Sequence, residues 1–330
     1  RDAMADLEAQ KAVLAQTASR IPILEEALEK ISYGMKVQIR EGSAAKNFDI
    51  LVPLLEDHAD DVMFCSDDKH PDDLLVGHMD QLVKKALNLG YDPISVIRTC
   101  TLNPARHYGL QAGLLQAGDP ADLIVIDNLT DFNVRETYIN GELVAEDGKS
   151  LIKTSPGNTP NVFKAKPILE ADVNVPDNGS PINVIRALDG QLITKREVLP
   201  PRVSGASIVA DVERDILKIL VMNRYRESRP AVGFIRGFGF SSGAIASTVA
   251  HDSHNIIAVG VSDSDLVRAV NLLISSQGGI CIADGSFSKH LPLPVAGIMS
   301  NRDGKEVARL YEEINGLAKR LGTPLSAPFM

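Results

Sequence analysis

In the first hundred positions, segments whose apolar residues have helical spacing alternate with segments whose apolar residues have strand-like spacing. Residues 2–19 and 24–33 carry apolar side chains at helical spacing, and Gly34 ends the second of these helices. Residues 35–39 alternate between apolar and polar side chains and residues 61–65 form a short apolar run, so both predict strands. Further helices are expected over residues 43–57, capped by Ser43, 73–89 and 93–101. Strands that alternate with helices in this way are typical of parallel βα units.

The pattern changes near residue 109, where glycines and the pairs Asp-Pro and Asn-Gly begin to separate short strand-like runs. The Asn140-Gly141 pair is a hairpin-turn signal. Residues 153–181 are rich in Pro, Asn, Asp and Gly, which predicts an extended connection. Strands are expected over residues 123–127, 135–139 and 142–145.

Strands and helices mix again from residue 182 onward, which indicates a separate α+β domain. The expected strands are 219–225, 231–235, 256–261 and 280–283, and the expected helices are 263–276 and 305–321. A possible helix follows the Gly-x-Gly stretch at 237–239. The chain therefore divides into three predicted parts, residues 1–108, 109–165 and 166–330.

Composition narrows the class of protein. The chain has 330 residues, of which 44% are hydrophobic and 23% charged, values that are ordinary for globular proteins. Its net charge of −9 argues against a general nucleic-acid binder, and no apolar run approaches the roughly 18 residues of a membrane helix. Three widely separated cysteines fit a reducing cytoplasm. The first residues do not resemble a signal peptide, and the absence of Met at position 1 suggests a trimmed chain or a part of a longer one.

Asp67 and Asp68 directly follow the strand predicted at 61–65. In a βα barrel the carboxyl ends of the strands form the active-site face, and a carboxylate there can ligate a metal and accept a proton from metal-bound water. The same residues are typical of a solvated turn before a helix. The residue types alone favour the turn.

Arg40 and Glu41 lie between the strand at 35–39 and the helix expected from Ser43. The free amides at a helix start favour an anion or a hydrogen-bond acceptor. The spacing alone favours a plain capped helix, so a role for these residues beside a substrate is a hypothesis.

Phe238 lies in the stretch GFGF, and His251, Asp252 and His254 lie in the stretch HDSHN. The HxxH spacing with one aspartate could ligate a metal, and the loop could instead form a lid over a bound base. A structural polar turn is the simpler interpretation. The chain has no GxGxxG motif and no P-loop, so evidence for phosphate binding is weak.

The segment TLNPARHYGL at 101–110, followed by GDPADLIVID at 118–127, resembles the end of the amidohydrolase barrel. Over residues 24–330 the chain is similar to the adenine deaminase family of that superfamily. The resemblance implies the C-terminal part of a TIM-like (β/α)8 metal-dependent hydrolase barrel over 1–108, a small β-sandwich over 109–165 and an α+β domain over 166–330. The segments that carry it are GMKVQIREGSAAKN, MFCSDDKHPDDLLVGH, NRYRESRPAVGFIRGFGFSSGAIASTVAHDSHNIIAVG and LPLPVAGIMS.

The resemblance implies hydrolytic deamination of adenine to hypoxanthine and ammonia, in purine salvage, with no nucleic-acid or membrane partner. Asp67 would then be a metal ligand and the proton acceptor, and Asp68 a weaker catalytic candidate. The family generally uses two divalent metals, manganese or iron, with zinc as another possibility. It also implies a cytoplasmic homo-oligomer. Residues beside the substrate or in a lid would be Arg40, Glu41, Phe238, His251, Asp252 and His254.

This chain departs from the family pattern in its missing ligands. It has no HxH motif, and Arg20-Ile21-Pro22-Ile23 stands where the family has a catalytic His-Glu pair. We therefore expect a hidden break between Ser19 and Leu24, and most metal ligands outside this chain. Activity of the chain alone stays open. Two alternatives also stay open: another amidohydrolase acting on a nucleobase or cyclic amide, and a non-catalytic assembly module.

Overall fold

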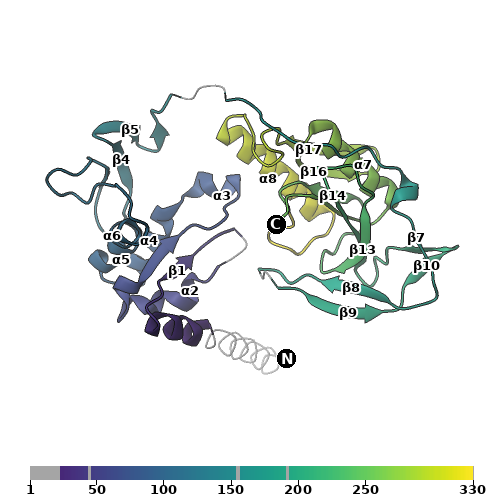
Figure 1. Cartoon of the computed structure of the whole chain (residues 1–330), viewed down its shortest axis with the longest axis horizontal. Coiled ribbons are helices and arrows are strands. Elements are labelled where there is room, and N and C mark those ends of the chain that lie inside the picture. The colour runs from purple at the N-terminus through teal and green to yellow at the C-terminus, as the bar shows by residue number, and fades with distance from the viewer. Residues whose placement is uncertain (1–22, 44–45, 154–156, 191–192, 330) are drawn as a thin grey trace, which may run out of the picture. The chain divides into compact units, whose positions relative to one another are not determined.

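A computed structural model describes residues 23–43, 46–153, 157–190 and 193–329 of the chain. The helix expected over 2–19 and the expected break after Ser19 fall on residues outside this range. The chain forms two compact units, one of residues 1–69 and 76–154 and one of residues 70–75 and 155–330 (Figure 1). The content of helix and strand is mixed, as predicted. No helix among the described residues is long and apolar enough to span a membrane.

The first unit is built on a parallel pair of strands, β1 (Val37–Arg40) and β2 (Val62–Cys65). The predicted alternation holds in β1, where Val37 and Ile39 are buried and the polar residues between them are not. These apolar side chains join a core formed with Phe48, Leu82 and other residues of the flanking helices. Around the pair lie a helix over residues 23–32, α2 (Phe48–Leu51), η1 (Val52–Leu55), η2 (Ala59–Asp61), α4 (Met79–Asn88), α5 (Pro93–Cys100) and α6 (Leu102–Tyr108). Helix α3 (Pro71–Val76) follows β2 in the sequence, and its residues 71–75 belong to the second unit.

Two helix predictions for this part of the chain were wrong in detail. The helix expected from Ser43 begins only at Phe48, and Glu41 pairs with Lys46 in an isolated antiparallel bridge before it. The single helix expected over 73–89 is two helices, α3 and α4, separated at Gly77-His78. Helix α6 holds Pro104 in its first turn, where a proline is tolerated because its missing N–H has no helical acceptor.

Asn103 explains why α6 packs where it does. Its buried side-chain amide donates to the carbonyl of Ala59 at 2.7 Å and to that of Val62 at 2.8 Å. A buried amide needs such partners, since an unsatisfied polar group costs about 1–3 kcal/mol. Asn103 therefore ties the end of the first unit's helices to the start of β2.

A four-stranded antiparallel sheet follows in the same unit, in the order β3-β4-β5-β6. The hairpin predicted at Asn140-Gly141 is confirmed, and both residues have positive φ, 51° and 80°, as a tight hairpin turn requires. The strands are β3 (Leu123–Ile126), β4 (Val134–Ile139), β5 (Glu142–Glu146) and β6 (Lys149–Ser150).

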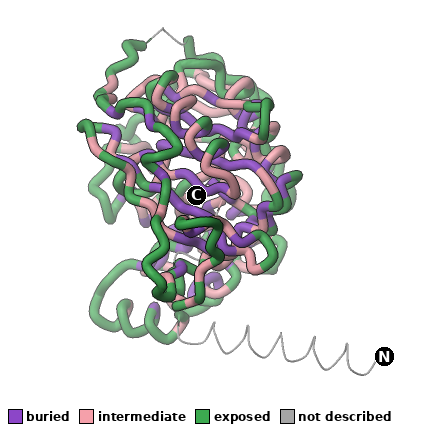
Figure 2. The backbone as a smooth tube through the Cα atoms, turned by 90° about the vertical axis from the view of Figure 1, so that its right-hand side faces the viewer, coloured by how far each residue is buried: buried purple, intermediate pink, exposed green. Residues whose placement is uncertain are grey.

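The second unit is an eight-stranded, mostly antiparallel sheet with one long helix on each face (Figure 1). Helix α8 (Gly304–Arg320) packs its apolar side chains against one set of strand residues, and α7 (Asp263–Ser276) packs against the alternate set. Both faces of the central strands are therefore buried, and the purple, buried stretches of the tube in Figure 2 gather in the interior of this unit. The strand order is β17-β16-β14-β15-β12-β13-β8-β9.

The bounds of these strands correct several predictions. The stretch expected to form a helix after Gly239 contains the strand β14, and the strand expected over 219–225 begins and ends three residues earlier as β12. The strands of the large sheet are β8 (Ile182–Arg186), β9 (Lys195–Leu199), β12 (Ile216–Met222), β13 (Ala231–Arg236), β14 (Ala244–Ser247), β15 (Ile256–Gly260), β16 (Gly279–Asp284) and β17 (Phe287–Pro292). A separate three-stranded sheet has the order β10-β11-β7. Its strands are β7 (Val175–Pro176), which precedes β8, and β10 (Arg202–Ser204) and β11 (Ser207–Val209), which come between β9 and β12 in the sequence.

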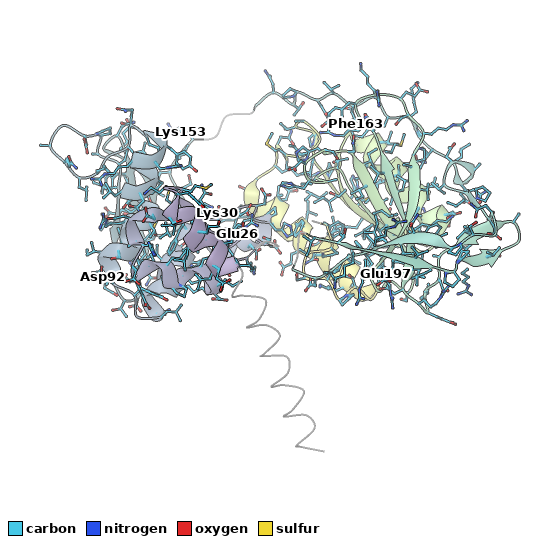
Figure 3. The ribbon with its side chains drawn as sticks, turned by 60° about the horizontal axis from the view of Figure 1, so that its bottom comes forward. Glu26, Lys30, Asp92, Lys153, Phe163 and Glu197 are labelled. Carbon is cyan, nitrogen blue, oxygen red and sulfur yellow. The ribbon has the colours of Figure 1, made fainter. Side chains whose placement is uncertain are left out.

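Within the connection predicted over 153–181, the described residues 157–181, here called the strap, form η3 (Glu170–Asp172) and β7 and otherwise no helix or strand. Apolar side chains of the strap pack on the second unit. The amide of Lys164 donates to the carbonyl of Arg224 at 2.7 Å. Asn271 of α7 both accepts from the amide of Ile168 and donates to its carbonyl. Phe163, labelled in Figure 3, belongs to the same strap.

Lys218 interrupts the apolar run of β12 and is 1% exposed. Its ammonium donates to both carboxylate oxygens of Asp263, at 2.7 and 2.9 Å, and to the carbonyl of Val173 at 3.1 Å. Asp263 begins helix α7, and its side chain is 30% exposed. A single buried cation thus joins the sheet, the helix and the strap.

We expect Asp263→Asn to lower the free energy of unfolding by about 2–3 kcal/mol, because it leaves the Lys218 charge buried without its anion. The cost stays below that of a fully buried pair because Asp263 is partly exposed. Lys218→Met fills a similar volume without a charge and should cost at most about 1 kcal/mol. Urea denaturation of both variants measures the difference.

The matched control is Glu26→Gln, which breaks the exposed pair with Lys30 on one helix (Figure 3). It should change the free energy of unfolding by less than about 0.5 kcal/mol. A larger loss for Lys218→Met than for Asp263→Asn would contradict the assignment.

Candidate functional site

The carboxyl ends of β1 and β2 lie side by side because the two strands are parallel. The register pairs Gln38 with Met63 and Arg40 with Cys65. The buried residues Val37 and Ile39 alternate with Gln38 and Arg40, so these two polar side chains lie on the face away from the core. The topology therefore brings Arg40 close to the loop that follows Cys65.

Asp67 lies at a bend of this loop and forms a salt bridge with Arg40. Its backbone has φ of +54°, a left-handed conformation that aspartate tolerates better than most residues. The Arg40 guanidinium donates to Oδ2 at 2.6 Å, and the amide of Asp68 donates to Oδ1 at 2.8 Å. Both oxygens of Asp67 thus have hydrogen-bond donors, and its side chain is 24% exposed. A charge-assisted pair of this geometry fixes the carboxylate's orientation.

Asn47 holds the other side of Arg40. Its side-chain oxygen accepts from the Arg40 amide at 2.8 Å, and its own amide donates to the Arg40 carbonyl at 3.1 Å. The amide of Ser43 also donates to the carbonyl of Asp68 at 2.9 Å. A cavity of about 500 Å³ opens here, lined by Gln38, Arg40, Asn47, Cys65, Ser66 and Asp67.

Glu41 is held by Lys85 of α4, a residue that sequence reasoning missed. The Lys85 ammonium lies 3.4 Å from Glu41 and 2.8 Å from Asp49, and 4.5 Å above the ring of Phe48. Burial acts to lower the pKa of Lys85, but the hydrogen bond to Asp49 and the charge of Glu41 outweigh it and raise the pKa. Glu41 does not line the cavity, so its position beside a substrate stays a hypothesis.

Of the two predicted aspartates, Asp67 lines the cavity, whereas Asp68 does not line it and its side chain is exposed. Sequence reasoning missed Gln38 and Asn47. The signal for Gln38 was its place two residues before Arg40 in an alternating strand. Asn47 was not recognisable, because its role depends on the bridge that replaces the expected helix.

The GFGF stretch forms a loop organised by Asp215. The two oxygens of this carboxylate accept from the amides of Gly237 and Gly239, each at 2.7 Å. These amides are therefore not available to a phosphate. Phe238 is 8% exposed and packs against Phe240, with ring centroids 5.7 Å apart, in the core under α8.

The structure brings His251, Asp252 and His254 together in the loop after β14. His251 Nδ1 lies 2.5 Å from Asp252, and the two histidine rings are 6.4 Å apart between centroids. Arg224, which is buried, donates through Nε to the carbonyl of His254 and through Nη2 to the hydroxyl of Tyr225. The loop is thus anchored to the domain by backbone contacts, while the His251 and Asp252 side chains are exposed.

Within the described ranges, no three His, Cys, Asp or Glu side chains come together in a way that could hold a metal ion. Asp67 contributes one carboxylate, and Arg40 and the Asp68 amide surround it. The described residues therefore do not by themselves fit a two-metal centre.

Comparison with known proteins finds two family matches and many similar adenine deaminases. Residues 7–144 match the amidohydrolase family and residues 191–330 match the adenine deaminase C-terminal domain. An adenine deaminase of Salinibacter ruber is 50% identical over 309 residues, which are 93% of this chain and 56% of that protein. One of Methanosarcina mazei is 47% identical over 319 residues, 93% of this chain and 58% of that protein. The chain is thus similar to adenine deaminases along most of its own length.

The chain spans somewhat more than half the length of these adenine deaminases. The amidohydrolase match covers the described part of the first unit through β5, and the C-terminal match covers the large sheet from β9 to α8. A solved β-aspartyl dipeptidase of Fervidobacterium islandicum is 23% identical over 40% of this chain and 39% of its own, with a TM-score of 0.33. That score does not establish a shared fold.

The cavity also contains a thiol whose reactivity reports on Asp67. Burial raises the pKa of Cys65, the Asp67 charge raises it further, and the Asp67 amide and Arg40 oppose this. Burial raises the pKa of Cys100 from 9.0 to about 11. Because the thiolate is the nucleophile, the large rise in the pKa of Cys100 leaves only a very small reactive fraction of that thiol at pH 8.

We expect iodoacetamide at pH 8 to label Cys65 well before Cys100, as followed by mass spectrometry. Asp67→Asn should accelerate the labelling of Cys65, because removing the negative charge lowers the thiol's pKa. Labelling of Cys100 is the internal control and should not change. Equal rates at Cys65 and Cys100, or a slower Cys65 in Asp67→Asn, would contradict the described geometry.

Proposed function

We propose that this chain forms part of a metal-dependent enzyme that hydrolyses adenine to hypoxanthine and ammonia. The observation that carries the proposal is the 50% identity, over 93% of the chain, to a protein named adenine deaminase. The match of residues 191–330 to the adenine deaminase C-terminal domain supports adenine over other amidohydrolase substrates. The proposal includes a cytoplasmic homo-oligomer.

The same similarity supports an architecture for the two units. We propose that β1 and β2 are late strands of a (β/α)8 barrel, that β3–β6 belong to a small β-sandwich and that the large sheet is the C-terminal domain. The parallel pairing of β1 with β2 is consistent with a barrel. In a barrel, the loops after these strands lie at the catalytic face.

Asp67 is the proposed proton acceptor. A water attacks C6 of adenine while its proton passes to the Asp67 carboxylate and the electron pair of the C6–N1 double bond moves to N1. Asp67 then gives this proton to the amino nitrogen, the C6–N6 bond breaks and ammonia leaves. The hydroxyl proton of the intermediate passes to N1 as the C6 carbonyl forms, which gives hypoxanthine. Such positioned proton transfer contributes about 10²–10⁴-fold to the rate. The Arg40 guanidinium, 2.6 Å from Oδ2, holds the carboxylate in place for both transfers.

Arg40, Asn47 and Gln38 give the cavity a polar lining that suits a base rich in nitrogen atoms. Asp68 is the weaker catalytic candidate, because neither it nor Glu41 lines the cavity. In the lid hypothesis, the exposed pair His251 and Asp252 would cover the bound base, and His254 would anchor the lid to the domain. Phe238 would support that region from the core rather than contact adenine.

Amidohydrolases depend on divalent metal ions, and the resemblance favours a pair of manganese or iron ions, with zinc possible. Such ions lower the pKa of a bound water towards about 7. Among the described residues, Asp67 is the one metal ligand that the proposal includes. The assignment of Asp67 as a metal ligand is therefore part of the proposal.

The sharpest test is Asp67→Asn in the purified protein supplied with Mn²⁺ or Fe²⁺. We expect kcat for adenine to fall about 10²–10⁴-fold, because asparagine cannot accept the proton. Asp68→Asn should lose less. Asp147→Asn, in an exposed turn after β5, is the matched control and should retain kcat within about twofold. Retained activity in Asp67→Asn would remove its assigned role.

Substrate choice is tested on the same protein with adenine, cytosine, guanine and dihydroorotate. Ammonia release from adenine above the other substrates supports the proposal. Preference for another substrate would favour a different amidohydrolase activity, and release from none of them would favour an assembly role.

The lid hypothesis has a separate test. We expect His251→Ala combined with His254→Ala to raise KM for adenine several-fold, with kcat less affected, because a lid acts mainly on binding and water exclusion. Steady-state kinetics measure the split. Unchanged kcat and KM would remove the lid.

A further inference from the structure

The side-chain amide of Asn47 has one end fixed and one end without a partner. Its oxygen Oδ1 accepts from the backbone amide of Arg40 at 2.8 Å. Because a backbone N–H can only donate, this contact identifies which end of the side-chain amide is oxygen and which is nitrogen. Among the described residues, no atom accepts a hydrogen bond from Nδ2 of Asn47. Asn47 therefore presents a donor whose orientation is already set.

This orientation comes from strand β1, although Asn47 stands at the start of helix α2. Asn47 is the N-cap of that helix, a place where an asparagine side chain ordinarily accepts from an amide of the first turn. The Asn47 side chain makes no such contact with α2. Its backbone amide donates to the carbonyl of Arg40 at 3.1 Å, which fastens the residue to the end of β1 a second time. The side chain is therefore bound to the strand that carries Arg40 and does not cap the helix.

Asn47 is half-buried and lines the same cavity as Asp67. The cavity volume of about 500 Å³ lies within the range of small-molecule sites. The other side-chain amide in its wall belongs to Gln38, whose nitrogen donates to the hydroxyl of Tyr108 at 2.5 Å. The Arg40 guanidinium donates to Asp67 at 2.6 Å. In the described part of the wall, Nδ2 of Asn47 is therefore the amide nitrogen that is left for a ligand.

A half-buried donor in a cavity wall is matched by a ligand that brings an acceptor, because an unmet polar group weakens binding. Adenine carries such acceptors at its ring nitrogens N3 and N7. We propose that Asn47 is a specificity-determining residue that donates through Nδ2 to N3 or N7 of the base. The inference rests on the proposed deaminase function, because it takes adenine as the base whose C6 faces Asp67. It extends that function from the reacting carbon to recognition of the ring.

The test measures the binding of adenine, 3-deazaadenine and 7-deazaadenine to the full chain by titration calorimetry. Each analogue replaces one ring nitrogen by a C–H group and therefore lacks one acceptor. EDTA is present, so that the metal-dependent conversion of adenine does not proceed during the titration. We expect one of the analogues to bind wild type about five- to tenfold more weakly than adenine, the factor that one net hydrogen bond supports. The analogue with this loss identifies the contacted nitrogen.

Two substitutions separate the donor from the contact that holds Arg40. Asn47→Asp removes the donor and keeps an oxygen for the Arg40 amide, so adenine and the analogue that lacks the contacted nitrogen should bind within about twofold of each other. Asn47→Ala removes both ends of the amide and should abolish the same discrimination. Hydrogen exchange at the Arg40 amide should quicken in Asn47→Ala and stay near the wild-type rate in Asn47→Asp. Lost discrimination with slow exchange assigns the effect to Nδ2 and not to a loosened strand.

Asn133→Ala is the matched control in the same unit. The side-chain nitrogen of Asn133 donates to Asp127 at 2.7 Å, so it already has an acceptor within the protein. Asn133 does not line the cavity. This variant should discriminate between adenine and the two analogues as wild type does.

Equal binding of adenine and both analogues by wild type would overturn the inference, as would the same discrimination in wild type and Asn47→Asp. Failure of wild type to bind any of the three bases would also overturn it. Ammonia release from adenine, measured in wild type with Mn²⁺ or Fe²⁺, tests the proposed function separately. If no ammonia is released but Asn47→Asp loses the discrimination, recognition by Asn47 stands and the proposed function fails.

Discussion

The parallel pairing of β1 with β2 is the constraint on which the candidate site depends. Only a parallel register sets Arg40 beside Cys65, and through it beside Asp67 two residues later. An antiparallel pair would place these residues at opposite ends of the strands. The apolar residues of both strands support the pairing, because they enter one core with the flanking helices. Asn103 adds to this by fixing the start of β2.

Buried charge organises the second unit in a comparable way. Lys218 sits inside an otherwise apolar strand and compensates its charge with Asp263 at the start of α7. The same ammonium binds the carbonyl of Val173, so the strap that precedes the sheet is part of the same network. Burial of apolar residues on both faces of the sheet supplies stability, and these polar contacts select one arrangement of helix, sheet and strap.

Local pattern was a good guide wherever one residue type decides the backbone. The Asn140-Gly141 turn and the helices α5 and α8 lie close to their predicted bounds, because positive φ, capping and amphipathic spacing are local properties. Pattern failed where distant partners decide. Residues 244–247 form a strand because β15 and β16 flank them, and Glu41 pairs with Lys46 in a bridge where a helix start was expected.

The sequence by itself indicated the resemblance to adenine deaminases, the candidate carboxylates and the division between helix-rich and strand-rich parts, because these follow from motifs and periodicity. Only the tertiary structure decided what surrounds Asp67. Arg40 lies 27 positions before it, so no local signal links the two residues. Their proximity follows from the parallel pairing of β1 with β2, which depends on both strands and their flanking helices burying apolar surface in one core.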